Sequence, residues 1–242
     1  MYLLQDQLLF PGADSSAGVY YRYHNSEHSL EREGIRLQGW HRRNPQGRPQ
    51  QVLLYFGGNA EDGVTALPML DSLGAEHAYT FNYRGYGQSQ GKPSQAALFA
   101  DALAIFDQLA TEHPQGEFVV IGRSLGSAMA GHVASQRNLQ GLILLTPLKS
   151  AKASGQRTYP FLPVGLLIRH PLDLHAMAPQ IQAPSLVLIA EQDRVINPEH
   201  SLATYAALAG AKQLVRLPGV GHNNLFDNPQ TLASMQAFLD QI

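Results

Sequence analysis

The chain has 242 residues, of which 44% are hydrophobic and 15% charged, and its formal net charge is −2. This length suits a single α/β domain, and the near-neutral charge offers no electrostatic footprint for nucleic acid or a strongly acidic partner. The absence of cysteine excludes disulfides, thiolate catalysis and cysteine-ligated zinc. The start of the sequence lacks the basic region of a signal peptide, and no apolar run reaches the ~18 residues of a membrane span. We therefore expect a cytoplasmic protein without a membrane span.

The first third of the sequence is predicted to form strands at residues 3–10, 18–24 and 35–40, separated by turn-rich segments. Residues 51–56, QVLLYF, are a continuous apolar run typical of a strand buried on both faces. A helix-like segment then begins at Glu61 and Asp62, whose charges suit a helix N-terminus, and runs to about Leu73.

From there strands and helices alternate to the end of the chain. Predicted strands are residues 78–83, 118–122, 141–146, 185–190 and 212–217, and predicted helices include 94–109 and 231–242. This alternation predicts an α/β fold with a mostly parallel, doubly wound sheet and antiparallel N-terminal strands. We expect one domain over residues 1–242, with a proline-broken lid insertion at about 147–184.

Residues 122–126 read Gly-Arg-Ser-Leu-Gly and join an apolar strand to a helix-like stretch. This is the G-x-S-x-G nucleophile elbow, in which glycines two positions on either side relieve collisions around a strained serine. Ligands of doubly wound sheets bind at the carboxyl ends of the strands, where this turn lies. Ser124 is therefore the candidate nucleophile.

A serine nucleophile needs a histidine base that is oriented by a carboxylate, and in α/β-hydrolases the acid and then the histidine follow the serine. Of the ten histidines, this order leaves His200 and His222. His200 is interpreted as an ordinary residue of a surface helix, whereas His222 lies in a loop after the last strand and is the candidate base.

Three carboxylates compete for the role of the acid. Asp193 follows the strand at 185–190 and is best placed to reach across the strand ends, so it is the preferred acid. Glu191 is interpreted as an exposed loop carboxylate. Asp173 is an outside candidate that better suits a helix N-cap.

Backbone amides must also stabilise the oxyanion of an acyl-transfer intermediate. We predict that Leu125 supplies one N–H, because it directly follows the nucleophile. The second is expected from the Gly57-Gly58-Asn59 turn after residues 51–56, with Asn59 preferred and Gly58 as the competing donor.

Five segments in this order, LLYFGGNAED, FNYRGYGQSQGKPS, VVIGRSLGS, LIAEQDRVINPEHS and GVGHNNLF, resemble the small α/β-hydrolase-fold serine hydrolases of the bud-emergence-homologue branch. This branch includes acyl-protein depalmitoylases, and the resemblance extends from about Gln51 to the end. It implies triad positions at Ser124, Asp193 and His222, and oxyanion positions at Asn59 and Leu125.

The sequence departs from this family pattern at two positions. Gly57 stands where many relatives have histidine, which removes a side chain that packs beneath the oxyanion turn. Asn82 replaces a common aspartate and leaves the charge partner of Arg84 open. The loop that carries Arg84, Tyr86 and Ser89 is expected to brace the oxyanion turn rather than to bind substrate.

The insertion contains two apolar groups that include Phe161 and Leu166. Two interpretations stay open: these side chains line an acyl pocket or touch a lipid surface in transient membrane contact, or they simply cover the apolar strand ends.

We therefore predict a serine hydrolase that cleaves a carboxylic ester or thioester of a small acyl substrate through an acyl-enzyme. The histidines show no metal-binding spacing, and neither a metal nor another cofactor is expected. The alternatives are a serine peptidase of the same fold and a non-catalytic small-molecule binding protein.

Overall fold

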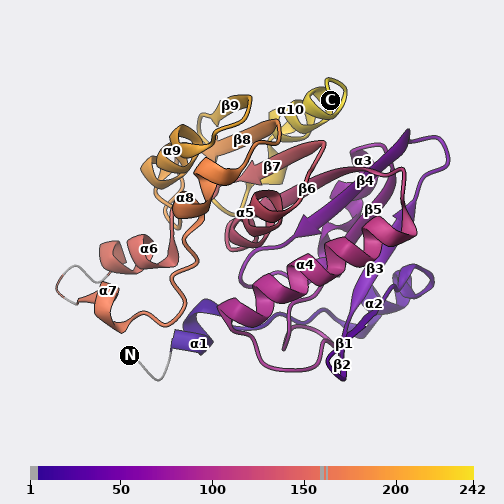
Figure 1. Cartoon of the computed structure of the whole chain (residues 1–242), viewed down its shortest axis with the longest axis horizontal. Coiled ribbons are helices and arrows are strands. Elements are labelled where there is room, and N and C mark those ends of the chain that lie inside the picture. Colours follow the sequence, from indigo (N-terminus) through magenta and orange to yellow (C-terminus); the bar gives the residue numbers. More distant parts are fainter. Residues whose placement is uncertain (1–4, 159–160, 162) are drawn as a thin grey trace.

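The computed structural model describes residues 5–158, 161 and 163–242, and of Thr158 and Leu166 only the backbone. Figure 1 shows a twisted central sheet with helices on both faces. Within the described ranges, no helix is long and apolar enough to cross a bilayer.

Seven strands form the central sheet, in the order β3-β5-β4-β6-β7-β8-β9. β3 pairs with β5 antiparallel, and every other neighbouring pair is parallel. The strands are β3 (Gly39–Arg43), β4 (Arg48–Phe56), β5 (Ala75–Phe81), β6 (Glu117–Arg123), β7 (Gly141–Leu145), β8 (Ser185–Ala190) and β9 (Lys212–Leu217). The predicted fold class is confirmed, and β6, which precedes Ser124, is the central strand.

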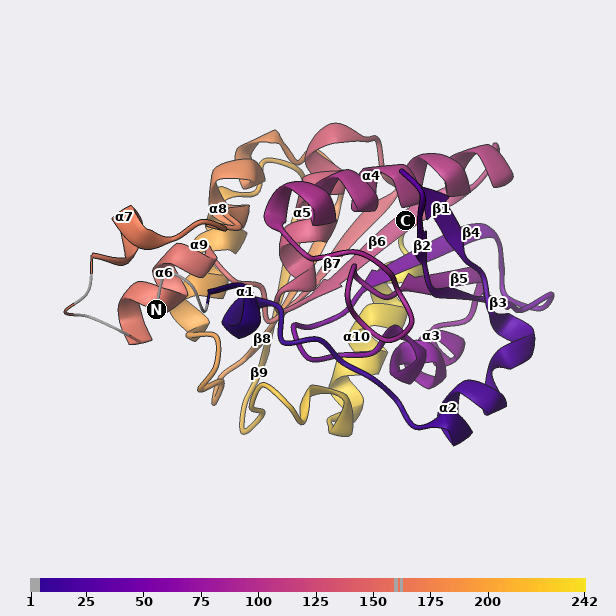
Figure 2. The same ribbon diagram turned by 90° about the horizontal axis from the view of Figure 1, so that it is seen from below.

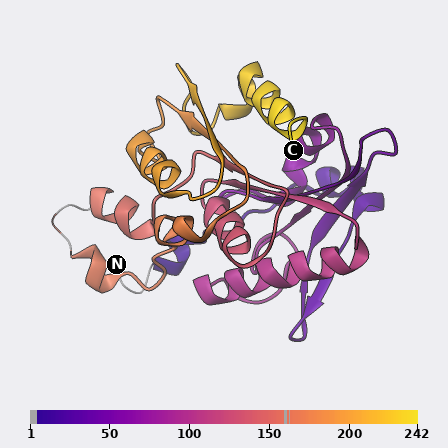
Figure 3. The same cartoon turned by 45° about the horizontal axis from the view of Figure 1, so that its top comes forward.

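Alternating side chains of the strands build a separate hydrophobic core on each face of the sheet. On β4, Val52 and Leu54 pack with one face, whereas Leu53 and Tyr55 pack with the other. The first face is covered by α4 (Gln95–Glu112), α5 (Gly126–Gln136) and α9 (Pro198–Ala207), and the second by α3 (Leu67–Ser72) and α10 (Pro229–Leu239). The view in Figure 3 shows these two helical layers on opposite sides of the strands.

The N-terminal prediction was wrong in part. Two segments predicted as strands form helices, α1 (Gln5–Leu9) and α2 (Ala17–Arg22), and a 3₁₀ turn covers His24–Ser26. Tyrosine and valine in α2 favour a strand by propensity, but Val19, Tyr20 and Tyr23 pack at helical spacing on the second core. Tertiary contact therefore decided the local structure.

The run at 35–40 is two strands rather than one. β2 (Ile35–Leu37) pairs with β1 (Leu30–Arg32) in a separate hairpin, while β3 joins the central sheet. Gln38, between them, is fully buried, and its N–H donates to Ser89 Oγ at 2.9 Å. Likewise, the helix expected from Glu61 is divided into a 3₁₀ turn (Gly63–Ala66) and α3.

The segment between β7 and β8, residues 147–184, contains α6 (Ala151–Thr158), α7 (Val164–Leu167), α8 (Leu174–Met177) and a 3₁₀ turn (Ala178–Gln180). We call it the 147–184 insertion. Asp173 accepts a hydrogen bond from the Ala176 N–H at the start of α8, as its helix-cap interpretation predicted. Figure 2 shows α6 and α7 at one end of the molecule, beyond the carboxyl ends of the strands and beside α1.

Candidate active site

Ser124 lies in a sharp turn between β6 and α5, with a φ of +51° that is strained for a non-glycine residue. The turn depends on close backbone contacts. A Cβ at Gly126 would lie 2.0 Å from the Phe56 carbonyl oxygen, and one at Gly122 would lie 2.6 Å from the Ala130 Cβ. Only glycine fits at either position, so these residues let the chain hold Ser124 above the central strand.

Asp193 and His222 come together although they follow different strands. Asp193 lies three residues after β8, and its Oδ2 lies 2.7 Å from His222 Nδ1. The N–H groups of Val195 and Ile196 donate to its Oδ1 at 2.8 and 2.7 Å. The Asp193 side chain is only 2% exposed. One oxygen of this buried carboxylate is held by backbone N–H groups, and the other contacts the imidazole of His222.

The competing residues lie elsewhere. Glu191 forms an ion pair with Arg216 at 2.7 Å, and Asp173 caps α8. His200 lies in the first turn of α9 and is partly exposed. Of the weighed residues, only Asp193 and His222 form the pair that a serine nucleophile requires.

The predicted oxyanion donors lie at the ends of the adjacent strands β4 and β6. Among the described residues, no hydrogen bond uses the N–H of Asn59 or of Leu125. The N–H of Gly58, in contrast, donates to Glu61 Oε2 at 2.9 Å. Gly58 was the competing donor, and its N–H is already occupied in this structure, which favours Asn59.

Glu61 and Arg123 are functional candidates that the sequence analysis missed. Glu61 Oε2 accepts hydrogen bonds from the Gly58 N–H and from Arg123, each at 2.9 Å, and Arg123 also donates to the His222 carbonyl oxygen at 3.1 Å. Burial is the largest single influence and opposes the charge of Arg123, but the combined interactions with Glu61 and Tyr55 exceed it and raise the pKa of the guanidinium. This pair therefore connects the oxyanion turn to the histidine loop.

The side chain of Glu61 also lies next to Gly57, at the position where many relatives have histidine. Its side-chain carbons lie 3.2–3.4 Å from the point where a Cβ of Gly57 would be. The Glu61 side chain thus occupies the space next to Gly57. An arginine inside the nucleophile motif, after a buried apolar strand, was the sequence signal that a buried acidic partner exists.

The loop after β5 braces the same turn. Tyr83 donates to the Gly57 carbonyl at 2.7 Å, and Tyr86 donates to the Asn59 carbonyl at 2.6 Å. Burial raises the pKa of both phenols, so each stays a protonated donor. Arg84 pairs with Asp101 instead of a neighbour at position 82, through contacts of 2.6 and 2.7 Å.

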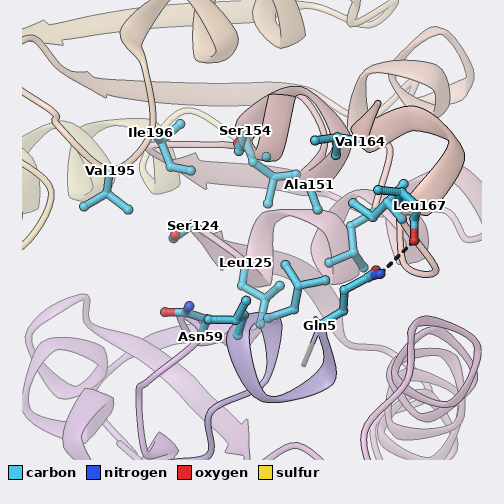
Figure 4. A pocket seen from close by; sticks show the side chains of 16 residues that line it. Gln5, Asn59, Ser124, Leu125, Ala151, Ser154, Val164, Leu167, Val195 and Ile196 are labelled. Atoms are coloured by element: carbon cyan, nitrogen blue, oxygen red, sulfur yellow. Dashed lines mark hydrogen bonds between the residues drawn. The ribbon is translucent and has the colours of Figure 1, made fainter. Parts of the chain in front are cut away.

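An apolar cavity of about 350 Å³ opens on one side of Ser124. Figure 4 shows Ser124, Leu125 and Asn59 at one end of it and the 147–184 insertion at the other. Helix α1 forms a further wall with Leu8 and Leu9, and Gln5 donates to the Leu167 carbonyl at 2.7 Å. The N-terminal segment thus helps to enclose the cavity, which the sequence analysis did not foresee.

Of the two predicted pocket residues, the structure places only the side chain of Phe161, and it does not line this cavity. Phe161 is 98% exposed and is not among the residues that line the cavity. Leu166 lies in α7, but its side chain is outside the described part of the chain. Val164 and Leu167, in the same helix, do line the cavity.

A second cavity of about 390 Å³ lies on the other side of Ser124 and is polar. Ser124 and His222 both line it, together with Asp14, Glu61 and Arg123. Ser124 and Asn59 are shared by the two cavities. The nucleophile candidate therefore lies between an apolar and a polar compartment.

No group of three or more histidine or carboxylate side chains within the described ranges is arranged to hold a metal ion. That the reaction proceeds without a metal ion stays a prediction.

A family model described as serine aminopeptidase, S33, matches residues 47–170. An uncharacterized protein of Mycobacterium tuberculosis is 34% identical over 217 residues, which cover 86% of this chain and 76% of that protein. An α/β-hydrolase domain-containing protein of Caenorhabditis elegans is 30% identical over 78% of this chain, which spans 57% of its length.

Among solved structures, an esterase of Pyrococcus furiosus superimposes with a TM-score of 0.74 over 96% of each chain, at 17% sequence identity. At that identity the likeness shows a shared fold. Together, these comparisons confirm the resemblance to small α/β-hydrolases that the five sequence segments indicated.

Proposed function

Because the chain belongs to the serine aminopeptidase S33 family and has the α/β-hydrolase fold, we propose that it is a serine hydrolase that cleaves a carboxylic ester or thioester. The observation that carries this proposal is the 2.7 Å contact between Asp193 and His222 beside a serine held at positive φ. Ser124 and His222 also line one cavity. These are the parts that a serine nucleophile needs.

In the first half of the reaction, Ser124 Oγ attacks the acyl carbon while His222 Nε2 takes its proton. Asp193 stabilises the imidazolium through Nδ1. The unused N–H groups of Asn59 and Leu125 donate to the oxyanion of the tetrahedral intermediate. As the intermediate collapses, His222 returns the proton to the leaving oxygen or sulfur, which departs and leaves an acyl-serine.

In the second half, water enters and His222 takes one of its protons as the water oxygen attacks the acyl carbon. The second tetrahedral intermediate releases the carboxylic acid and returns a proton to Ser124. We assign the apolar cavity to the acyl group and the polar cavity to the leaving group and the incoming water. Every step of this proposed reaction uses only side chains and backbone groups of this chain, together with substrate and water.

The lining of the apolar cavity favours an esterase over an aminopeptidase. An aminopeptidase leaves the free amine on the acyl part of its substrate, so a carboxylate must lie on the acyl side. Among the described residues that line the apolar cavity there is no Asp or Glu. A protonated amine would lose hydration there without an ionic partner.

The first test is labelling of the full chain with a fluorophosphonate probe. We expect a single modified residue, Ser124, and no labelling of Ser124→Ala. Modification mapped to another serine, or labelling that persists in the variant, would overturn the proposal.

The acyl assignment is tested with p-nitrophenyl esters of increasing chain length. Activity is expected to rise over the first few carbons by about fourfold per buried methylene and then to level off. Leu167→Ser should flatten the rise, whereas Phe161→Ser, outside the cavity, should leave it unchanged. A rise that continues to palmitate would contradict a short acyl cavity, and faster cleavage of aminoacyl amides would favour the peptidase.

A further inference from the structure

Two large exposed apolar side chains lie at the mouth of the apolar cavity, and a third lies between the two insertion helices that contribute to its wall. Leu8 and Val195 line the cavity and are 57% and 61% exposed, so they form its rim. Phe161 is 98% exposed and lies in the turn between α6 and α7, which form another wall. Exposed apolar groups that surround a ligand-binding opening mark an interaction surface.

The charge of the 147–184 insertion is opposite in sign to that of the whole chain. It holds four cationic residues and one carboxylate, so its formal charge is +3, whereas the chain carries −2. The residues are Lys149, Lys152, Arg157, Arg169 and Asp173.

The outer cations of this region are available to a partner. Lys152 and Arg157 are exposed and form no ion pair among the described residues, and the same holds for Arg194, next to Val195. Two cations of the insertion also act on His200, whose pKa is lowered first by burial and then by Arg157 and Lys149. The surface beside the cavity mouth is therefore both apolar and positively charged.

This surface also has a suitable position. In Figures 1 and 2, α6 and α7 form one end of the molecule, with α1 beside them.

We propose that the cavity rim and the cations of the insertion dock on a membrane surface that contains anionic lipids. Phe161, Leu8 and Val195 enter the boundary between headgroups and acyl chains, and Lys152, Arg157 and Arg194 lie among the anionic headgroups. The docking itself is independent of catalysis. Its consequence, that an acyl chain passes from the bilayer into the apolar cavity, rests on the proposed function.

The experiment is co-sedimentation of the full chain with vesicles of phosphatidylcholine alone and of phosphatidylcholine with added phosphatidylglycerol. We expect binding that requires phosphatidylglycerol and weakens as salt is raised. The double variant Lys152→Gln/Arg157→Gln should weaken binding by about fivefold for each lost cation. Its matched control, Arg22→Gln/Lys92→Gln, removes two exposed cations outside the insertion and should bind like the unaltered chain.

The apolar part is tested by Phe161→Ser, which should weaken vesicle binding, against Tyr21→Ser, which changes an aromatic side chain that is 77% exposed on α2. The Phe161 and lysine–arginine variants should hydrolyse a soluble short-chain ester at the unaltered rate, which shows that they fold. Ser124→Ala should bind vesicles normally, so docking is tested even if the proposed hydrolysis fails.

Equal binding to neutral and anionic vesicles, or an equal loss in the control variants, would overturn the proposal. Binding to polyglutamate without binding to vesicles would also overturn it and would indicate an acidic protein surface instead.

Discussion

Histidines occupy two very different regions of this molecule. His222 lies beyond the carboxyl ends of the strands, 2.7 Å from a carboxylate that two backbone amides hold in place. Near the opposite edge, His41 Nε2 lies 2.8 Å from His77 Nδ1, and the ring of His113 lies 4.3 Å from that of His77. Burial, followed by repulsion from His77, His28 and His113, lowers the pKa of His41 to about 4.

The difference shows that burial and proximity to other titratable groups do not by themselves give a histidine a carboxylate partner. The carboxylates nearest this cluster are more distant, with Glu76 at 3.7 Å from His77 and Glu112 at 3.6 Å from His28. The histidine cluster stacks on Tyr79 and serves packing. A fixed buried carboxylate, and a serine that lines the same cavity as His222, distinguish the other region.

The largest expected effect comes from altering one histidine in each region. His222→Gln should lower ester turnover on the order of 10⁶-fold, because the nucleophile loses its base. His77→Gln, the matched change in the cluster, should leave turnover unchanged. Steady-state kinetics on a soluble ester measures both, and a comparable loss in the two variants would show that the comparison is mistaken.

The next effect concerns the carboxylate. Asp193→Asn should lower turnover on the order of 10⁴-fold, because the amide favours the wrong tautomer of His222 while the fold is retained. Glu191→Gln only removes an ion pair with Arg216 and should cost little. The same ester assay, with circular dichroism to verify folding, tests this assignment. A large loss in Glu191→Gln and a small loss in Asp193→Asn would assign the acid to Glu191 instead.

A smaller effect is expected at the ion pair beneath the oxyanion turn. Glu61→Gln should lower turnover by about tenfold, because Gly58 and the turn lose a charged acceptor without losing either oxyanion donor. It should also lower the free energy of unfolding by about 3 kcal/mol, since Arg123 is left without its partner.

The control for Glu61 is Asp107→Asn, which breaks an exposed pair with Arg137. This change should cost about 1 kcal/mol or less in urea denaturation. Equal losses of stability in the two variants would mean that the Glu61–Arg123 pair contributes no more than a surface ion pair.

The smallest effect is on stability at acid pH and leaves activity near neutrality unchanged. The pKa of His41 is lower in the fold than in the unfolded chain, so its contribution to stability is fully present above about pH 6.5 and decreases as the pH falls toward 4. His41→Gln should therefore lose less stability than the unaltered chain when the pH falls from about 7.5 to 5.5.

Urea denaturation midpoints at the two pH values measure this difference. His24→Gln, at an exposed position outside the cluster, is the control and should keep the full pH dependence. An unchanged dependence in His41→Gln would exclude His41 as a source of acid sensitivity.

Much of the fold followed from local sequence patterns. The strands predicted at 185–190 and 212–217 have the bounds of β8 and β9, and Ser94 and Asn197 cap α4 and α9 through their side chains. Candidate site residues were likewise found from spacing and order. The N-terminal helices were missed because amphipathic tyrosine and leucine segments suit either structure until a packing partner selects one.

The sequence by itself determined the turn at Ser124 in part, because the need for glycine at position 122 arises from steric contacts within one strand–turn–helix unit, whereas at position 126 it arises from the approach of Phe56 and Gly57. It also determined the order of Ser124, Asp193 and His222 along the chain. Only the tertiary structure decided which groups support them. Glu61 and Arg123 meet because β4 and β6 are neighbours. Gln5 reaches Leu167 across 162 residues to form the cavity wall, a contact that depends on the whole fold and on no local preference.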